Sequence, residues 1–124
     1  MWIRRNENPA YNRVGDCVIR SISTVLNQSW EETYVSLCVY GFMFCDMPSS
    51  NAIWALYLAD KGFSRKVIDA GNTTYTVEDF CKDHPSGSYI LGTGTHAVAV
   101  IDGNHLDTWD SGNEQPIYYF EREE

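Results

Sequence analysis

Cysteine and histidine are the residues of this sequence best suited to nucleophilic chemistry, because a thiolate attacks carbonyl carbon and an imidazole exchanges protons near neutral pH. The chain has 124 residues, with three histidines and four cysteines. His96 begins the most apolar strand-like segment and follows the small residues Gly92-Thr-Gly-Thr95, which would admit a ligand backbone. His84 lies in a surface-type turn, and His105 follows a hairpin turn. His96 is therefore the best candidate for a catalytic base.

Cys17 differs from the other cysteines in its place at the start of a predicted helix. It follows Gly15-Asp16 and opens an amphipathic stretch, for which Asp16 is the expected N-cap. The free N–H groups and the dipole at a helix N-terminus lower a thiol pKa and favour the thiolate. Gly15 would let a substrate backbone come close. The other cysteines stand in apolar segments and are typical of small hydrophobic side chains: Cys38, Cys45 and Cys81.

A catalytic thiolate needs a base, and the base needs a third group to fix its tautomer. His96 can be the base, and the next strand offers two aspartates as the third group, Asp107 and Asp110. A three-residue loop over Asp102-Gly-Asn104 would set His96 opposite Asp110, about 5.5 Å apart at Cβ, with Asp107 on the other face. A two-residue turn would bring Asp107 to the same face but leave it distant. We therefore predict that Asp110 accepts the His96 ring N–H and that Asp107 lies outside the site.

The order and context of these residues resemble the papain-like cysteine peptidases. The nucleophile stands in Gly-Asp-Cys17 at the start of the first long helix, and His96 starts a strand. Asp110-Ser-Gly112 after Trp109 is similar to the corner at which that superfamily places its Asn or Asp. The resemblance spans roughly residues 12 to 112. The compact size resembles bacterial and phage members, including the domains that remove double-glycine leader peptides. The Cys-Gly-Ser-Cys-Trp motif of plant and lysosomal members is absent, and Cys17 and His96 are closer in sequence than in those members.

The resemblance implies a Cys17-His96-Asp110 site that hydrolyses a peptide or isopeptide bond of a peptide or protein substrate without metal or cofactor. Many members carry a Gln shortly before the nucleophile, as an oxyanion donor. This sequence has no Gln there, and Asn12 is the nearest side-chain amide. We assign the oxyanion hole to Asn12 and the backbone N–H of Cys17.

Other functions remain open alongside hydrolysis of a peptide bond. The same three residues could serve acyl transfer to an amine, as in transglutaminase-like or arylamine acetyltransferase-like enzymes, or cleavage of cell-wall peptides. The chain could instead be a binding protein of the same fold with weak or no turnover. A structural protein with an incidental Cys and His is the last alternative.

The elements that must position these residues divide the chain into a helical half and a strand-rich half. Apolar spacing and capping signatures predict helices over 17–26, from the Ser29–Glu32 box to about Gly41, over 51–61, and from the Thr76–Asp79 box to before Pro85. Alternating and β-branched segments predict strands over 63–68, 88–92, 96–101, 105–109 and 116–120. This order predicts an α+β fold. Its papain-like form would pack an N-terminal helical lobe, with the nucleophile helix, on a C-terminal antiparallel sheet.

Composition indicates a single domain over residues 1–124, with 44% hydrophobic residues to build its core. The formal charge of −8 argues against a nucleic-acid partner, because phosphate backbones attract basic surfaces. No apolar run is long enough for a membrane span or follows the N-terminus as a signal peptide would, so we expect a cytoplasmic protein without a membrane partner. Reduced thiols are then expected. A zinc site on Cys81-x-x-His84 with Cys38 or Cys45 is disfavoured, because paired-ligand spacing occurs only once.

Overall fold

The computed structural model describes residues 1–68 and 74–122, which form four helices and one six-stranded sheet. This confirms the predicted α+β class. None of the helices in these two segments is long and apolar enough to cross a membrane. The helices are α1 (Cys17–Leu26), α2 (Trp30–Met43), α3 (Asn51–Asp60) and α4 (Val77–Asp83). The strands are β1 (Trp2–Arg4), β2 (Phe63–Val67), β3 (Ser88–Gly92), β4 (Ala97–Ile101), β5 (Asn104–Asp107) and β6 (Tyr118–Arg122).

The strands lie in the order β1-β5-β4-β3-β6-β2. β1 pairs in parallel with β5, while the other neighbours are antiparallel. The expectation of a wholly antiparallel, C-terminal sheet is therefore wrong at this edge, because three residues from the N-terminus complete it. A three-residue strand is too short to show a period in the sequence.

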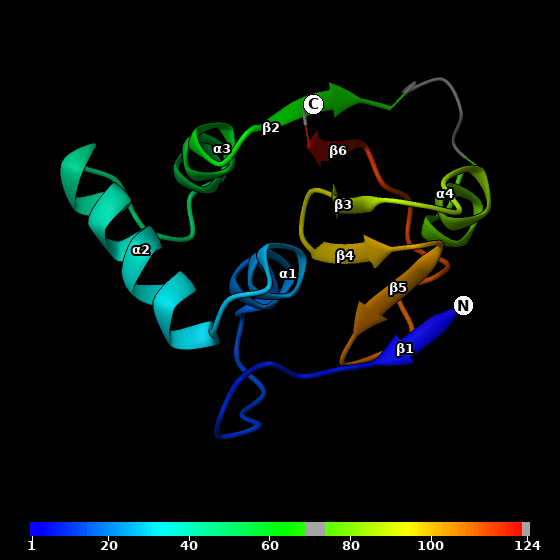
Figure 1. Ribbon diagram of the computed structural model, residues 1–124, viewed down its shortest axis with the longest axis horizontal. Helices are drawn as coiled ribbons and strands as arrows, with labels where there is room; N and C mark the ends of the chain where they lie inside the picture. Colours follow the sequence, from blue (N-terminus) through cyan, green and yellow to red (C-terminus); the bar gives the residue numbers. More distant parts are fainter. Residues whose placement is uncertain (69–73, 123–124) are drawn as a thin grey trace.

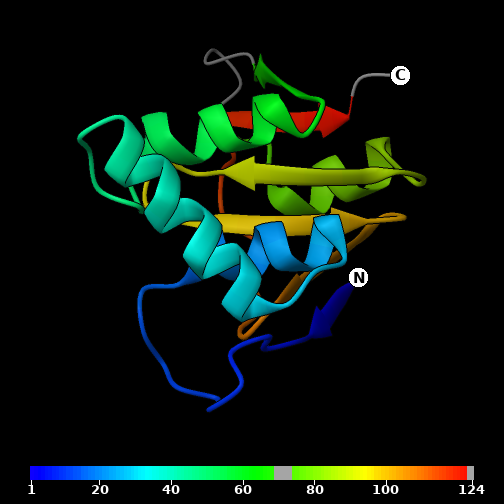
Figure 2. The ribbon, with the colours of Figure 1, turned by 60° about the vertical axis from the view of Figure 1, so that its left-hand side comes forward.

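Helices cover both faces of the sheet, with α1, α2 and α3 on one face and α4 on the other (Figures 1 and 2). The alternation of side chains along the central strands explains both layers. Ile90, Ala97 and Ala99 pack in the core under α1 to α3. Leu91 and Val98, on the opposite face, pack in the core under α4.

The predicted helix starts are confirmed at α2 and α4, with the N-cap half of the expected capping box at α2 and the full box at α4. The Ser29 side chain accepts a hydrogen bond from the Glu32 N–H at 3.0 Å. Thr76 and Asp79 form a reciprocal capping box before α4, with bonds of 3.2 and 3.1 Å. Helix positions were predictable from sequence because these bonds are local.

The β4–β5 hairpin turns on two residues instead of the predicted three. Asp102 and Gly103 both have positive φ, 51° and 78°, as a type I′ turn requires, and Ile101 pairs with Asn104. Extended by one pair, this register sets Asp107 opposite Val98, two residues from the position of His96. β5 ends at Asp107 and does not continue to Trp109.

Candidate active site

The start of α1 brings Cys17 to His96 at the entrance of β4. Burial raises the pKa of the Cys17 thiol, but a hydrogen bond with the His96 side chain and one with the Ala97 backbone lower it. The positive charges of His96 and Arg20 lower it further, and the net result is a pKa below that of an ordinary thiol. Cys17 therefore has the character of an activated nucleophile.

His96 lies between the thiol of Cys17 and the carboxylate of Asp107. Its Nε2 is 2.6 Å from Oδ2 of Asp107, which leaves Nδ1 for the hydrogen bond with Cys17. Burial lowers the pKa of the imidazole, but its hydrogen bonds with Asp107 and Cys17 outweigh burial and raise the pKa to about 9. The Trp109 ring lies against the imidazole, with 5.0 Å between ring centroids. A lowered thiol pKa beside a raised imidazole pKa favours a thiolate–imidazolium pair.

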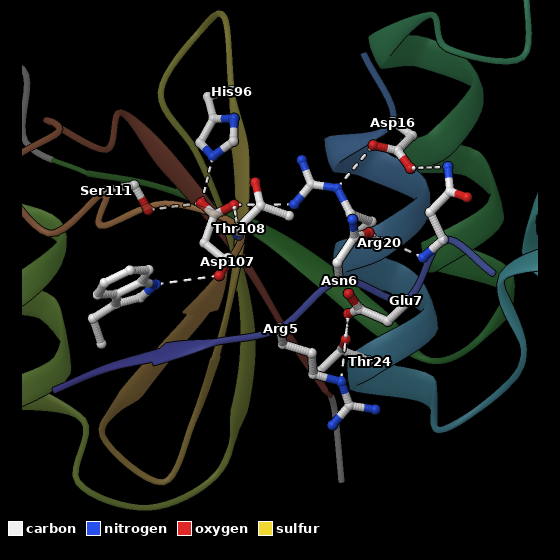
Figure 3. A network of polar contacts seen from close by, with 12 residues as sticks. Arg5, Asn6, Glu7, Asp16, Arg20, Thr24, His96, Asp107, Thr108 and Ser111 are labelled. Atoms are coloured by element: carbon white, nitrogen blue, oxygen red, sulfur yellow. Dashed lines mark hydrogen bonds and ion pairs between the residues drawn. The ribbon is translucent and has the colours of Figure 1, made fainter. Parts of the chain in front are cut away.

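The Asp107 carboxylate is buried and receives four hydrogen bonds (Figure 3). Oδ2 accepts from His96 and from the Ser111 hydroxyl at 2.8 Å, and Oδ1 accepts from Arg20 at 3.0 Å and from the Thr108 N–H at 2.8 Å. Burial raises the pKa of this carboxyl, but its contacts with His96, Ser111 and Arg20 bring it below the usual value. Asp107 therefore remains ionised and fixes the orientation of His96.

The prediction that Asp110 orients His96 is wrong. Asp110 accepts a hydrogen bond from His105 Nε2 at 2.9 Å and from the Gly112 N–H at 3.0 Å. The two-residue turn shifts the register by one residue, and the chain leaves the ladder after Asp107, so Asp110 is carried away from His96. The Asp102-Gly103 dipeptide was the signal that could have found this, because Asp-Gly is a preferred pair for a two-residue type I′ turn.

Arg20 is a residue of the site that the sequence analysis missed. Only 8% of it is exposed, and it joins the two carboxylates beside Cys17, with Nε 2.8 Å from Asp16 and Nη1 3.0 Å from Asp107 (Figure 3). The spacing of Asp16 and Arg20, four residues apart on one helix, was the available signal. Arg20 ties the start of the nucleophile helix to the strand that orients the base.

Asp16 stands at the N-cap position of α1, but its side chain makes no capping hydrogen bond, so that part of the prediction is wrong. Its carboxylate instead accepts from Arg20, from the Asn8 amide at 3.3 Å and from the Trp30 indole at 3.0 Å. Three segments thus converge on the turn that presents Cys17.

Cys17 and the predicted oxyanion donors share an open cleft of about 580 Å³. Asn12 lines it with an exposed side chain that makes no hydrogen bond to any residue the structure describes. The Cys17 N–H, in the first turn of α1, has no partner within the helix. A smaller hollow of about 150 Å³, walled by Trp54 and Tyr118, also includes Cys17 and His96. A substrate crossing from one hollow to the other would pass over the thiol.

A second Cys-His-Asp set lies between α4 and β5, with Cys81 and His105 buried and Asp110 exposed. Cys81 Sγ is 3.9 Å from His105 Nδ1, and His105 in turn bonds to Asp110. Burial raises the pKa of Cys81 to about 11, and only 2% of the residue is exposed. The Cys81 thiol is therefore unsuited to nucleophilic attack. Cys45, expected to behave as a small hydrophobic side chain, is exposed.

The cysteines and histidines form neither a metal-ion cluster nor a disulfide among the residues that the structure describes. In residues 1–68 and 74–122, no three His, Cys, Asp or Glu side chains are grouped to hold a metal ion. All four cysteines are free thiols. His84, placed in a surface turn by the sequence, is the C-cap of α4 and stacks on Phe80, with 3.8 Å between ring centroids.

In comparisons with known proteins, no family model, no curated protein and no solved structure matches this chain.

Proposed function

We propose that this protein is a papain-like thiol hydrolase that cleaves a peptide or isopeptide bond with Cys17, His96 and Asp107. The observation that carries the proposal is the chain of contacts from a buried carboxylate, through an imidazole with raised pKa, to a thiol with lowered pKa. Nucleophile, base and orienting group are the three roles that acyl transfer through a thiol needs.

In the first step, the Cys17 thiolate attacks the carbonyl carbon of the scissile bond. A C–S bond forms, and the carbonyl electrons move to oxygen, where the Cys17 N–H and the Asn12 amide hold the negative charge. The C–N bond then breaks, and the leaving nitrogen takes the proton from Nδ1 of His96. The amine departs, and a thioester with Cys17 remains.

In the second half of the reaction, water replaces the amine. Neutral His96 removes a proton from the attacking water through Nδ1, while Asp107 holds the other ring nitrogen. The C–S bond breaks, the carboxylic acid leaves, and the thiolate–imidazolium pair returns. The protons balance over the cycle without an external acid or base.

The arrangement of the elements also supports a papain-like fold. The nucleophile opens the first long helix, the base precedes a central strand, and the carboxylate ends the next strand. The cleft is open, as binding of a polypeptide substrate requires. We place the activity in the cytoplasm, where the free thiols would stay reduced.

Mass-spectrometric mapping of iodoacetamide labelling at pH 6 tests the proposal. Cys17 should label at least about tenfold faster than Cys38, Cys45 or Cys81, because ordinary thiols with a pKa near 8.5 are almost fully protonated there. Cys45 is the matched control, since it is exposed and does not line the cleft of Cys17 and His96. Equal labelling of Cys17 and Cys45 in the folded protein would remove the hydrolase proposal.

A further inference from the structure

The charges around the Cys17 cleft are opposite in sign to the charge of the whole protein. The chain has 17 acidic and nine basic residues, yet the exposed charged side chains that line the cleft are Arg4 and Arg13. They come from two separate segments, β1 and the loop before α1. An exposed pair of cations beside the nucleophile is unexpected in so acidic a chain.

The two arginines are not engaged by carboxylates of the protein. Within the described parts of the chain, no carboxylate lies within 4.0 Å of either guanidinium, whereas Arg5 is 3.7 Å from Glu7 and Lys66 is 3.5 Å from Glu121. The guanidinium of Arg4 lies over the Trp2 ring, 5.4 Å from its centre. The donors of both side chains are left available to a ligand.

The acidic groups next to the cleft do not cancel this positive charge. Asp16 and Asp107 are buried, at 4% and 1% exposed, and both bind Arg20. Asp107 also binds His96. A ligand entering the cleft therefore meets the two arginines, while these carboxylates are shielded.

We infer that the cleft binds an acidic stretch of the substrate polypeptide, with Asp or Glu side chains held by Arg4 and Arg13. The inference rests on the proposed function, since it assigns the substrate of that same site. A guanidinium donates two parallel hydrogen bonds to a carboxylate, which makes arginine well suited to this recognition.

Salt screening decides whether the local or the overall charge controls binding. At physiological ionic strength the Debye length is about 8 Å, so the protein's distant acidic residues repel a bound peptide only weakly. The cleft arginines lie closer to a bound peptide than these acidic residues do, and the low-dielectric walls of a cleft focus their field there. The local arginines therefore outweigh the net negative charge once the peptide is in the cleft.

The first test compares iodoacetate with iodoacetamide, which alkylate the same sulfur but differ by one negative charge. The iodoacetate-to-iodoacetamide rate ratio at Cys17 should exceed the ratio at Cys45 at least about threefold. It should fall in the Arg4→Gln/Arg13→Gln double variant and in high salt. Arg122→Gln, with an exposed guanidinium over Phe63, is a suitable single-site control for charge loss and should leave the ratio unchanged.

The second test extends the comparison to peptides. Two chloroacetamide peptides that differ only in carrying two Glu or two Gln should label Cys17 at rates about three- to tenfold apart, in favour of Glu. The double arginine variant should remove this preference. Rapid labelling of Cys17 without any preference for charge would overturn the acidic-substrate inference and leave the hydrolase proposal intact. Slow iodoacetamide labelling of Cys17, equal to that of Cys45, would overturn the hydrolase itself.

Discussion

Asp107 couples the chemistry of the site to the stability of the fold. One carboxylate holds His96 in position, balances Arg20 and accepts the Ser111 hydroxyl. It is almost completely buried. Removing its side chain would therefore disturb both, because buried Arg20 would lose one of its two carboxylate partners.

Substitution by asparagine should distinguish the role of Asp107 from that of Asp110. Asp107→Asn keeps the volume but removes the charge that raises the pKa of His96, so the Cys17 pKa should rise and iodoacetamide labelling at pH 6 should slow by roughly tenfold. Asp110→Asn should leave labelling within about twofold, because Asp110 binds His105. Loss of labelling with Asp110→Asn alone would restore Asp110 to the site.

The pH profile of Cys17 alkylation reports the charge of His96. An adjacent cation favours the thiolate and so lowers the thiol pKa, and His96, with a pKa of about 9, supplies that cation up to about pH 9. His96→Gln should move the midpoint of the alkylation profile upward, toward the ordinary thiol value near 8.5. His84→Gln is the control and should not shift it. An unchanged profile in His96→Gln would mean that another group activates Cys17.

At the scale of elements, the candidate active site depends on how α1 is held against the end of β5. Arg20 extends from the helix to Asp107 and also binds Asp16 at the helix start. The helix itself was predictable, because amphipathic spacing within ten residues defines it. The ion pair between Arg20 and Asp107 was not predictable, because it joins side chains 87 positions apart in sequence. A polar residue inside a helix is also usually on its exposed face.

Hairpin register was the other point at which sequence reasoning failed. Strand existence follows from local β-branched and aromatic content, but register depends on a single residue of turn length, and a shift of one moves every side chain to the other face. The two-residue turn put Asp107 on the face of His96, and the end of β5 at Asp107 took Asp110 away from it. The expectation that Asp107 would stay distant after such a turn is also wrong, because its Oδ2 is 2.6 Å from His96 Nε2. The contact between Cys17 and His96 was predictable, because each residue has a distinctive local setting, at a helix start and at a strand start.

Substitution of Arg20 should affect both stability and thiol activation. Arg20→Met leaves Asp16 and Asp107 buried without their cation and should lower the free energy of unfolding by about 3–5 kcal/mol in urea titrations. Arg20→Lys keeps the positive charge but cannot donate from a planar guanidinium to both carboxylates, so it should lose less unfolding free energy than Arg20→Met. Because the Arg20 charge lowers the Cys17 pKa, the alkylation midpoint should rise in Arg20→Met more than in Arg20→Lys. An unmoved midpoint in both would confine Arg20 to a structural role.

At the scale of the whole molecule, β6 closes the sheet by inserting between β3 and β2. Gly92 on β3 has no Cβ, and an added Cβ would lie 2.2 Å from the Tyr118 ring, so any other residue there would force this buried ring to move. Phe120 packs on Trp54 of α3, with 5.1 Å between ring centroids. The last strand thus joins the sheet to the helical layer.

Truncation of the core residue of β6 should therefore destabilise the whole fold. Phe120→Ala should lower the free energy of unfolding by about 3–5 kcal/mol, because the residue is 2% exposed and its removal leaves a cavity. Ile117→Ala, at a position 48% exposed, should cost much less. Urea titration followed by tryptophan fluorescence measures both. Equal losses in the two variants would show that β6 contributes no more than the loop before it.

The place of β6 between β3 and β2 has a consequence for folding during synthesis on the ribosome. β6 is the sheet neighbour of β2 and one of the two neighbours of β3. Each of these strands therefore has an edge without a hydrogen-bonding partner while residues 97–122 are synthesised. At about 5–20 residues per second this interval lasts roughly one to five seconds. Tyr118, a wall of the small hollow beside Cys17, also belongs to β6. A nascent chain therefore carries Cys17 long before it has a finished cleft, and we expect the proposed hydrolase to be inactive until β6 has been synthesised.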